Sequence, residues 1–556
     1  MPLSNAAEVP GARDEVEADS NAMQPRGPIM SVATSRTLRA GLIILASAAV
    51  LALLTSLSQH AVPNNSDSST VVLEGYAMVH GNPLLHNWSL SLDSFWTVDA
   101  PFYALGYLLV GLRPILVNLV PALLGLLVVV SGACIARDGV RGRAAVIAAS
   151  AVVILLVLPS HALAFFLLQG PWHIGTALWC LLAFWALRSG RFGWGWGAAV
   201  VLLAAGLLGD IQALALGVLP IFAAGLVAIA RTRTWRSGLA PISAALAGIG
   251  LAEGIREIAL RIGTFTFNES HHTAKAAQAT RNLGHLLRWG EAMLGIDEGP
   301  YGGVHVPLVL ELAHLLTALC ILVCIVVAAL RLLRGAVLGQ NRGDAGAFAT
   351  WRLDDLLVFG ILGDVVVFEV LTLSNNILYA RYLTVGVIFS VILAARILGR
   401  ASPAIHPGRA LRVGAAAAIV LVALLSVEVA IELHAPVPDQ PVVALDNFLM
   451  AHHLRSGIGD YWAASVVSVQ SEGAIEIRPV VANLRKILEP DGRQATASWY
   501  AGKHFQFLVY QDEPYGRVDA ATVTGTFGPP ETTWVVGTFH VVVWAHPIAL
   551  SGPAFP

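Results

Sequence analysis

Long apolar runs recur along this chain from about residue 39 to about residue 433, and they constrain its fold more than any other feature. Each run is close to the roughly twenty residues that a helix needs to cross a bilayer. A soluble interior could not bury them all, because 56% of the residues are hydrophobic and only 13% are charged, about half of the usual share. We therefore exclude a soluble enzyme, a disordered chain and a coiled-coil rod, and we expect an all-α polytopic membrane bundle. The predicted spans, about eleven, are 39–58, 115–136, 144–160, 173–188, 196–209, 211–230, 238–262, 304–330, 355–373, 382–398 and 412–433.

Arginine residues are concentrated in alternate loops, as the positive-inside rule requires. Loops assigned to the cytoplasm contain several arginines each, and the loops between them contain few. The inner-loop arginines include Arg137, Arg141, Arg143, Arg188, Arg231, Arg233, Arg236, Arg331, Arg334, Arg396, Arg400 and Arg409. This pattern predicts a cytoplasmic N-terminus, a multi-pass protein of the cell (inner) membrane, and a C-terminal tail on the outer side.

The composition divides the chain into three regions. Residues 1–37 are polar and predict a disordered cytoplasmic N-terminus, and residues 38–433 form the predicted transmembrane domain with a large first outer loop at 59–112. Residues 434–556 have mixed composition and predict a small soluble α/β domain outside the membrane. Its expected elements are a helix at 442–455 and strands at 465–470, 474–481, 505–510 and 534–544. Two apolar stretches, 101–112 and 161–170, are too short to span and predict interfacial or re-entrant helices.

The first outer loop contains three carboxylates among aromatic residues. Glu74, Asp93 and Asp99 lie there, and His86 lies between the first two of them. Carboxylates held at the membrane surface could act as a general base or bind a metal ion. The alternative is a solvated loop whose acids have no chemical role.

Other polar residues lie at the predicted outer ends of spans. His173 is either an interfacial anchor or part of a site. Asp210 lies between two apolar runs, where an acid is costly unless it is paired or solvated; it either caps the following helix or has a function. Arg381 and Tyr382 open a span from the outer side. An arginine there either snorkels to lipid phosphates or binds a phosphorylated ligand, and we favour the ligand.

Cysteine usage and net charge argue against two other kinds of partner. Cys320 and Cys324 share a helix face, but neither a histidine nor an acid lies near them in sequence to complete a zinc shell, so packing is favoured over a metal site. The net charge of −2 gives no basic footprint for nucleic acid.

The first outer loop resembles the opening loop of the C-type membrane glycosyltransferases, the GT-C family. The motif is an acid, a Tyr, a Gly-x-Pro, an aromatic residue, and an acid before Pro-x-Tyr. Its positions here are Glu74, Tyr76, Gly81-Asn82-Pro83, Trp88 and Asp99-Ala100-Pro101-Phe102-Tyr103. The Ala380-Arg381-Tyr382-Leu383 stretch is similar to an Arg-Tyr segment near the last spans of such enzymes. One departure is the single Glu74, preceded by Leu73, where the family usually has an Asp or an Asp-Glu pair.

The resemblance implies a GT-C-like bundle that transfers a sugar from a polyprenyl-phosphate donor to an acceptor on the extracytoplasmic face. Glu74 or Asp99 would be the base and Asp93 a third catalytic candidate. The implied substrate site consists of Arg381 and Tyr382 near the lipid phosphate, together with His173, Asp210 and His86. No metal ligand set is assigned, and a divalent ion is left open as a cofactor. The alternatives are a lipid or solute transporter or flippase, and a non-catalytic scaffold; the absence of an inverted sequence repeat weakens the transporter hypothesis.

Overall fold

The computed structural model describes residues 30–91, 93–189, 192–267, 274–296, 307–338, 352–371, 377–401, 409–437, 441–511 and 517–550. It divides into two units, Met1–Ala49 and Val50–Pro556. In the first unit, most of the segment predicted to be disordered lies outside the described residues, but helix α1 (Met30–Ala61) already begins at Met30. The fold and sites described below belong to the second unit.

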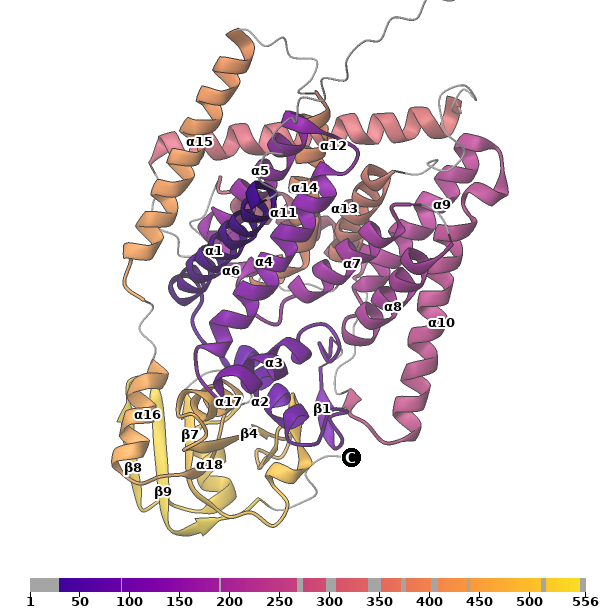
Figure 1. Cartoon of the computed structure of the whole chain (residues 1–556). Coiled ribbons are helices and arrows are strands. Elements are labelled where there is room, and N and C mark those ends of the chain that lie inside the picture. Colours follow the sequence, from indigo (N-terminus) through magenta and orange to yellow (C-terminus); the bar gives the residue numbers. More distant parts are fainter. Residues whose placement is uncertain are drawn as a thin grey trace, which may run out of the picture. The chain divides into compact units, whose positions relative to one another are not determined.

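Every predicted apolar run coincides with helical structure (Figure 1). The helices concerned, besides α1, are α4 (Leu116–Arg137), α5 (Gly142–Val157), α7 (Ile174–Leu187), α8 (Trp194–Gly209), α9 (Leu219–Thr232), α10 (Leu239–Arg261), α12 (Leu308–Leu338), α13 (Leu353–Val370), α14 (Thr384–Ala401) and α15 (Arg409–His434). A short 3₁₀ segment, Ile377–Leu383, leads into α14. The chain is therefore mostly helical, with apolar helices that suit a multi-pass membrane protein.

The number of spans remains a prediction. Within the described residues, 7 helices are long and apolar enough to cross a membrane, or up to 8 if α5 and α6 (His161–Leu167), bent by 90°, count as one span. Helices α7 and α8 have only 14 and 16 residues. Helix α13 contains four acidic residues, which lower its hydropathy. These three helices account for the difference from eleven.

The first outer loop folds into two short helices, α2 (Ser66–Val79) and α3 (Ala100–Val110), with strand β1 (Trp88–Leu90) between them. Asn65 caps α2 by accepting a hydrogen bond from the Ser68 backbone N–H at 3.0 Å. The two helices approach closely at Gly75, where a Cβ would lie 2.7 Å from the backbone of Tyr103 and of Ala104. A side chain at this position would push α2 away from α3.

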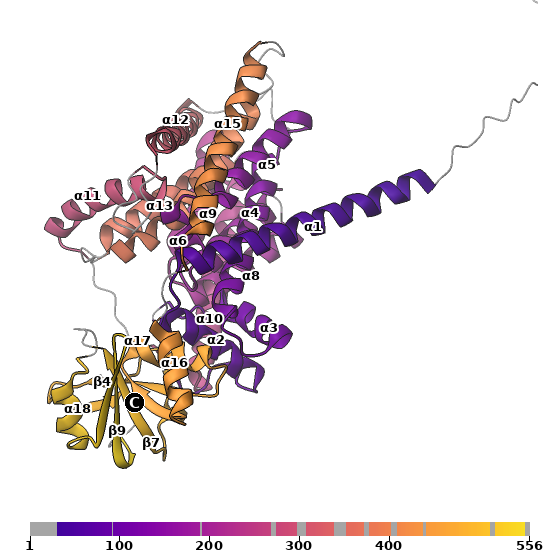
Figure 2. The same ribbon diagram turned by 90° about the vertical axis from the view of Figure 1, so that its left-hand side faces the viewer.

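The C-terminal region forms a six-stranded sheet in the order β5-β4-β3-β7-β9-β8. Its strands are β3 (Ser456–Gly459), β4 (Glu476–Ala482), β5 (Leu488–Pro490), β7 (Phe505–Gln511), β8 (Thr532–Val536) and β9 (Phe539–Ile548). Helices α16 (Pro441–Ala451) and α17 (Tyr461–Gln470) cover one side of the sheet and α18 (Ala520–Phe527) covers the other (Figure 2). The expected small α/β domain is present.

Two of the strand predictions differ from the structure. Residues 465–470 were expected to form a strand but lie in α17, because the Asp460 side chain caps this helix by accepting from the Ala463 N–H at 3.0 Å. Residues 534–544 form parts of two strands, β8 and β9, joined by a turn in which Gly537 has a φ of 60°. Glycine adopts that conformation without strain.

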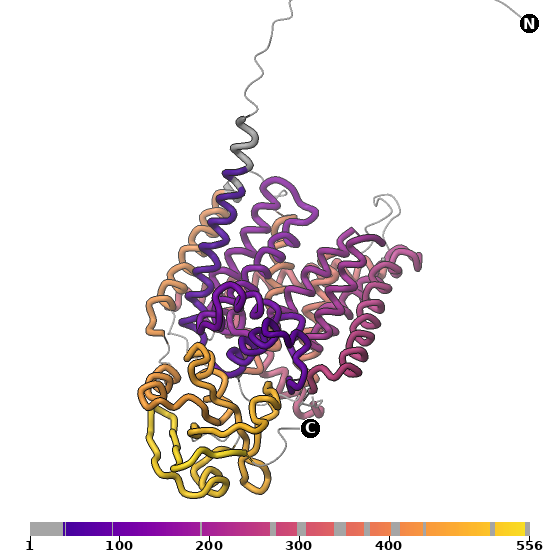
Figure 3. Tube along the Cα trace, turned by 60° about the horizontal axis from the view of Figure 1, so that its bottom comes forward, coloured from indigo at the N-terminus to yellow at the C-terminus, as the bar shows by residue number. Residues whose placement is uncertain are grey.

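The outer loop lies between the membrane helices and the C-terminal domain (Figure 3). A second sheet joins them, with β1 between β2 (Thr266–Phe267) and β6 (Ala495–Thr496). Arg113 also pairs with Glu472 of the domain at 2.6 Å. The backbone pairing makes the domain part of the wall of the site described below.

Arg231 on α9 and Asp355 on α13 form a buried bidentate ion pair, with nitrogen–oxygen distances of 2.5 and 3.0 Å. We expect Asp355→Ala to lower the free energy of unfolding by about 3–5 kcal/mol, because it removes the carboxylate that pairs with the buried Arg231 guanidinium and that accepts from the Arg352 N–H at the start of α13. The control is Glu257→Ala, which breaks the exposed Arg261–Glu257 pair and should cost no more than about 1 kcal/mol. Equal losses in detergent-solubilised protein would contradict this expectation.

Candidate functional site

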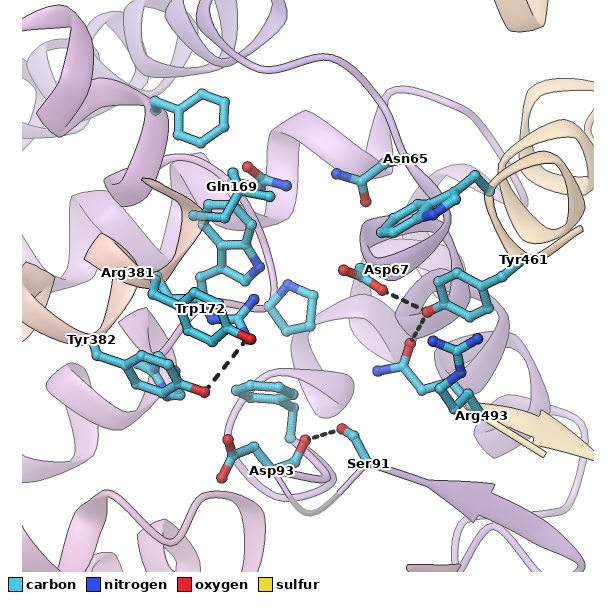
Figure 4. Close-up of a pocket in the computed structure, with 18 of the residues that line it drawn as sticks. Asn65, Asp67, Ser91, Asp93, Gln169, Trp172, Arg381, Tyr382, Tyr461 and Arg493 are labelled. Carbon is cyan, nitrogen blue, oxygen red and sulfur yellow. Dashed lines mark hydrogen bonds between the residues drawn. The ribbon is translucent and has the colours of Figure 1, made fainter. Parts of the chain in front are cut away.

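A cavity of about 420 Å³ opens between the outer loop, the α6–α7 connection, the 3₁₀ segment before α14 and the C-terminal domain. We call it the first cavity; Figure 4 shows its lining. Arg381 and Tyr382 lie on one side of it, Tyr461 and Arg493 lie on the other, and Asp93 lies below Arg381 in this view. Residues from four distant parts of the sequence therefore face one space.

The central polar group is a buried His–Asp pair. His173 precedes α7 and Asp210 follows α8, so this neighbouring pair of helices places both residues at the same end of the bundle. His173 Nδ1 lies 2.7 Å from Asp210 Oδ2, and Thr176 donates to the same oxygen. The Gln212 backbone N–H donates to Asp210 Oδ1 at 2.8 Å. Asp210 is thus paired on both oxygens, which offsets the cost of burying its charge.

Asp93 lies beside this pair and lines the first cavity. Burial and the nearby Asp210 raise the pKa of Asp93 to about 7, although His173 and Arg381 act in the opposite direction. A carboxylate that titrates close to neutral pH has the driving force to accept a proton from a substrate.

Arg381 lies against aromatic rings. Its guanidinium carbon is 5.6 Å from the ring centre of Trp172, 5.8 Å from that of Tyr379 and 5.1 Å from that of Tyr382. It also donates to the Tyr382 hydroxyl at 3.4 Å. These contacts hold the cation in place while leaving its other N–H groups able to bind an anion in the cavity.

The C-terminal domain completes the opposite wall. The Tyr461 hydroxyl lies 2.5 Å from Asp67 Oδ1 on α2 and 2.6 Å from Gln494 Oε1. Arg493 lies over the Tyr461 ring at 5.0 Å and pairs with Asp491 at 2.8 Å. These residues and Asp67 were not among the predicted site residues, because the sequence of this domain contains no catalytic motif.

Four predicted site residues do not line the first cavity: Asp210, which contacts the lining residue His173, and Glu74, Asp99 and His86. Glu74 is a buried residue of α2, and Asp99 is the buried residue that precedes α3. Burial, together with Asp99, raises the pKa of Glu74; burial, together with Asp210, raises that of Asp99 to about 8. Both carboxyl groups therefore hold their protons more tightly than they would in water. His86 donates from Nδ1 to the Gly263 carbonyl at 2.7 Å and lines a second cavity.

The same cluster offers a set of metal ligands. Ligand atoms of Asp93, His173 and Asp210 all lie within 4.8 Å of one another. Two carboxylates and an imidazole suit a divalent transition metal ion. Both Asp210 oxygens, however, already accept hydrogen bonds from protein donors. The residues thus fit an ion by type and spacing, and an ion there would compete with the His173–Asp210 contact.

The high pKa of Asp99 makes stability depend on pH. An unfolded aspartate titrates near 4, whereas Asp99 titrates near 8 in the fold, so the folded state holds this proton more tightly. The resulting stabilisation is complete below about pH 4 and is lost as the pH rises through about 8. The side chain of Asp99→Asn stays neutral, so this variant should not lose that stabilisation. We expect its free energy of unfolding, relative to that of the wild type, to rise by more than about 1 kcal/mol between pH 5 and pH 8.5. Thermal unfolding at both pH values tests this, with exposed Glu253→Gln as control; parallel shifts of wild type and Asp99→Asn would contradict it.

No protein-family model matches the sequence, and no curated protein matches it. The fold, however, is similar to that of solved structures. ArnT from Cupriavidus metallidurans in the apo state aligns at 13% identity with a TM-score of 0.50, over 91% of this chain and 98% of that one. The same protein bound to undecaprenyl phosphate gives 12% identity and a TM-score of 0.49, over 90% and 98%. An Archaeoglobus fulgidus oligosaccharyltransferase tethered to an acceptor peptide gives 12% and 0.43, over 84% and 69%.

At these identities the likeness is one of fold, and it is strongest for the apo ArnT structure among the three. It extends over the membrane helices, the outer loop and the C-terminal domain, since it covers 91% of the chain. The GT-C-like fold that the first outer loop predicted is therefore confirmed.

Proposed function

We propose that this chain is a membrane glycosyltransferase that moves a sugar from a polyprenyl-phosphate donor to an acceptor on the extracytoplasmic face. The observation that carries the proposal is the first cavity itself. It brings together Asp93, whose pKa is near 7, and Arg381, held among aromatic rings. A base beside a fixed cation is what transfer from a phosphate leaving group requires.

In the proposed reaction Asp93 takes the proton of an acceptor hydroxyl. The hydroxyl oxygen forms a bond to the anomeric carbon of the donor sugar, and the bond from that carbon to the phosphate oxygen breaks. The polyprenyl phosphate leaves with the electron pair, and Arg381 stabilises its charge. Of the three catalytic candidates, Asp93 is favoured as the base because Glu74 and Asp99 do not line the cavity.

The His173–Asp210 pair serves as support for Asp93 in this scheme. The charge of Asp210 is one cause of the raised pKa of Asp93, so it adjusts the proton affinity of the base. Tyr382 packs on His173 with ring centres 5.2 Å apart and holds the pair against Arg381. We assign the cluster to proton handling, with a divalent ion as the competing assignment.

The lipid-linked nature of the donor is supported by where Arg381 lies. It is within the candidate span Leu378–Ala401, close to its first residue. At that depth a phosphate headgroup is the anion that an arginine meets, and the lipid tail can remain in the bilayer. A nucleotide-linked donor would need a binding motif that the sequence lacks.

The arginine pattern leads us to propose a cytoplasmic N-terminus and an extracytoplasmic C-terminal domain. A cysteine placed at exposed Leu484 in that domain should react with a membrane-impermeant maleimide in intact cells, and one at exposed Trp235 should react only after permeabilisation. The variants are made in a chain whose four own cysteines are replaced by serine or alanine. The opposite pattern would invert the topology and remove the outward-facing site.

Asp93→Asn should lower kcat for sugar transfer by about 10²- to 10⁴-fold, because it removes the general base. Arg381→Gln should lower it by about 10²- to 10³-fold through weaker stabilisation of the leaving phosphate. The wild-type rate should rise with pH through about 7 as Asp93 loses its proton. The assay follows transfer from a panel of labelled polyprenyl-phosphate sugars in membranes.

Three comparisons sharpen this test. Exposed Glu253→Gln should keep the wild-type rate. Glu74→Gln and Asp99→Asn should lose far less than Asp93→Asn if the base is the residue that lines the cavity. A full rate in Asp93→Asn would remove the assigned base, and lipid translocation without sugar transfer would favour the flippase alternative.

A further inference from the structure

A second cavity, of about 560 Å³, lies between the outer loop and the C-terminal domain. The pairing of β1 with β6 separates the two cavities. Trp88 and Thr496 pair with each other across these strands, and both line the second cavity. Asp93 follows β1 and Gln494 precedes β6, and both line the first cavity. Its volume falls within the range of small-molecule sites.

One wall of the second cavity is aromatic and comes from the outer-loop helices. Tyr76 stacks on His80 with ring centres 4.0 Å apart, and Tyr107 meets them edge-on at 5.2 and 5.4 Å. Tyr76 is 38% exposed although it belongs to this cluster. The rings therefore brace one another and still present a flat apolar face to the cavity.

The facing wall contains two tryptophans and an arginine. Trp499 meets Trp88 edge-on at 5.2 Å, and the Arg478 guanidinium lies 4.4 Å from the centre of the Trp499 ring. Arg478 pairs with Glu476 at 2.8 Å. Glu472 on the same rim pairs with Arg113 at 2.6 Å.

The charges of the second cavity are thus compensated within the protein. Each acid on its rim has an arginine partner, and Arg478 also has an aromatic neighbour. An anion that bound to an arginine of the second cavity would have to displace the carboxylate already paired with it. In the first cavity, the contacts of Arg381 with Trp172 and Tyr382 are aromatic and would not compete with an anion in this way. Hydroxyl and amide groups of Asn87, Thr496 and Ser498 add neutral hydrogen-bonding positions.

Aromatic faces bordered by neutral donors and acceptors match the chemistry of a sugar ring. Its C–H face packs on an aromatic ring, and its hydroxyls need partners at the edge. We propose that the second cavity binds an uncharged saccharide segment of the acceptor, an assignment that rests on the proposed function of the first cavity. The acceptor would then be a glycan longer than one sugar unit.

The spacing of the cavities fits such a glycan. Asp93 is the fifth residue after Trp88, so their backbones lie at most about 18 Å apart. Along α2, Tyr76 is about 14 Å from Asp67, which lines the first cavity. Both distances are within the length of a short oligosaccharide, as the proposal requires if the terminal hydroxyl is to pass the β1–β6 pairing and reach Asp93.

Binding of soluble neutral trisaccharides tests this assignment without any transfer assay. The probes are mannotriose, galactotriose and arabinotriose, and inorganic phosphate is the anionic probe; saturation-transfer NMR on the full chain in detergent measures binding. We expect at least one trisaccharide to bind and phosphate not to compete with it. Tyr76→Ala and His80→Ala should weaken that binding at least tenfold, whereas Tyr76→Phe, which keeps the ring, should stay within about threefold.

Two controls separate this assignment from the proposed function. Trp235→Ala removes an exposed aromatic residue that does not line the cavity and should leave trisaccharide binding unchanged. Asp93→Asn should lower the rate of sugar transfer as stated above and keep trisaccharide binding. Absence of binding by all three probes, full binding in Tyr76→Ala, or displacement by phosphate would overturn the glycan site, while loss of transfer activity alone would bear on the first cavity only.

Discussion

The cost of placing ionised groups inside an apolar helical bundle determines most of this structure. A buried charge is stable only when it is paired or when it faces a polar cavity. Arg231 and Asp355 illustrate the first solution, with a bidentate contact between two helices. Asp210 combines the two solutions, because it is paired with His173 and His173 lines the first cavity. Charge that is neither paired nor near a cavity would have to leave the bundle, which restricts where a reactive group can lie.

This constraint explains why part of the site could be predicted from the sequence. His173, Asp210 and Arg381 were singled out because each interrupts or borders an apolar run on the side that has few arginines, and Asp93 because it is one of three acids in the first outer loop. Residues at helix ends on one side of a membrane meet when the helices pack side by side. The fold brings these four together for that reason, although their chemical roles are still proposals.

The choice among the outer-loop carboxylates depended on information that the sequence pattern lacks. Glu74 and Asp99 match the motif better than Asp93 does, yet both are buried and neither lines the first cavity. Which way a loop side chain points depends on the path of the backbone and on the close approach of the two helices at Gly75. A period-based argument applies within helices and strands, and it does not extend to Asp93, which lies in the loop between β1 and α3.

The C-terminal domain shows the same limit and also its consequence. Tyr461 carries no signal in the sequence, because its role arises from the contact between its hydroxyl and Asp67, nearly four hundred residues earlier in the chain. The β1–β6 pairing fixes this contact through the backbone. Since the same short ladder borders both cavities, a shift of the domain changes the wall of each at once. The domain is therefore structurally part of the walls of both cavities and not an appendage to the membrane bundle.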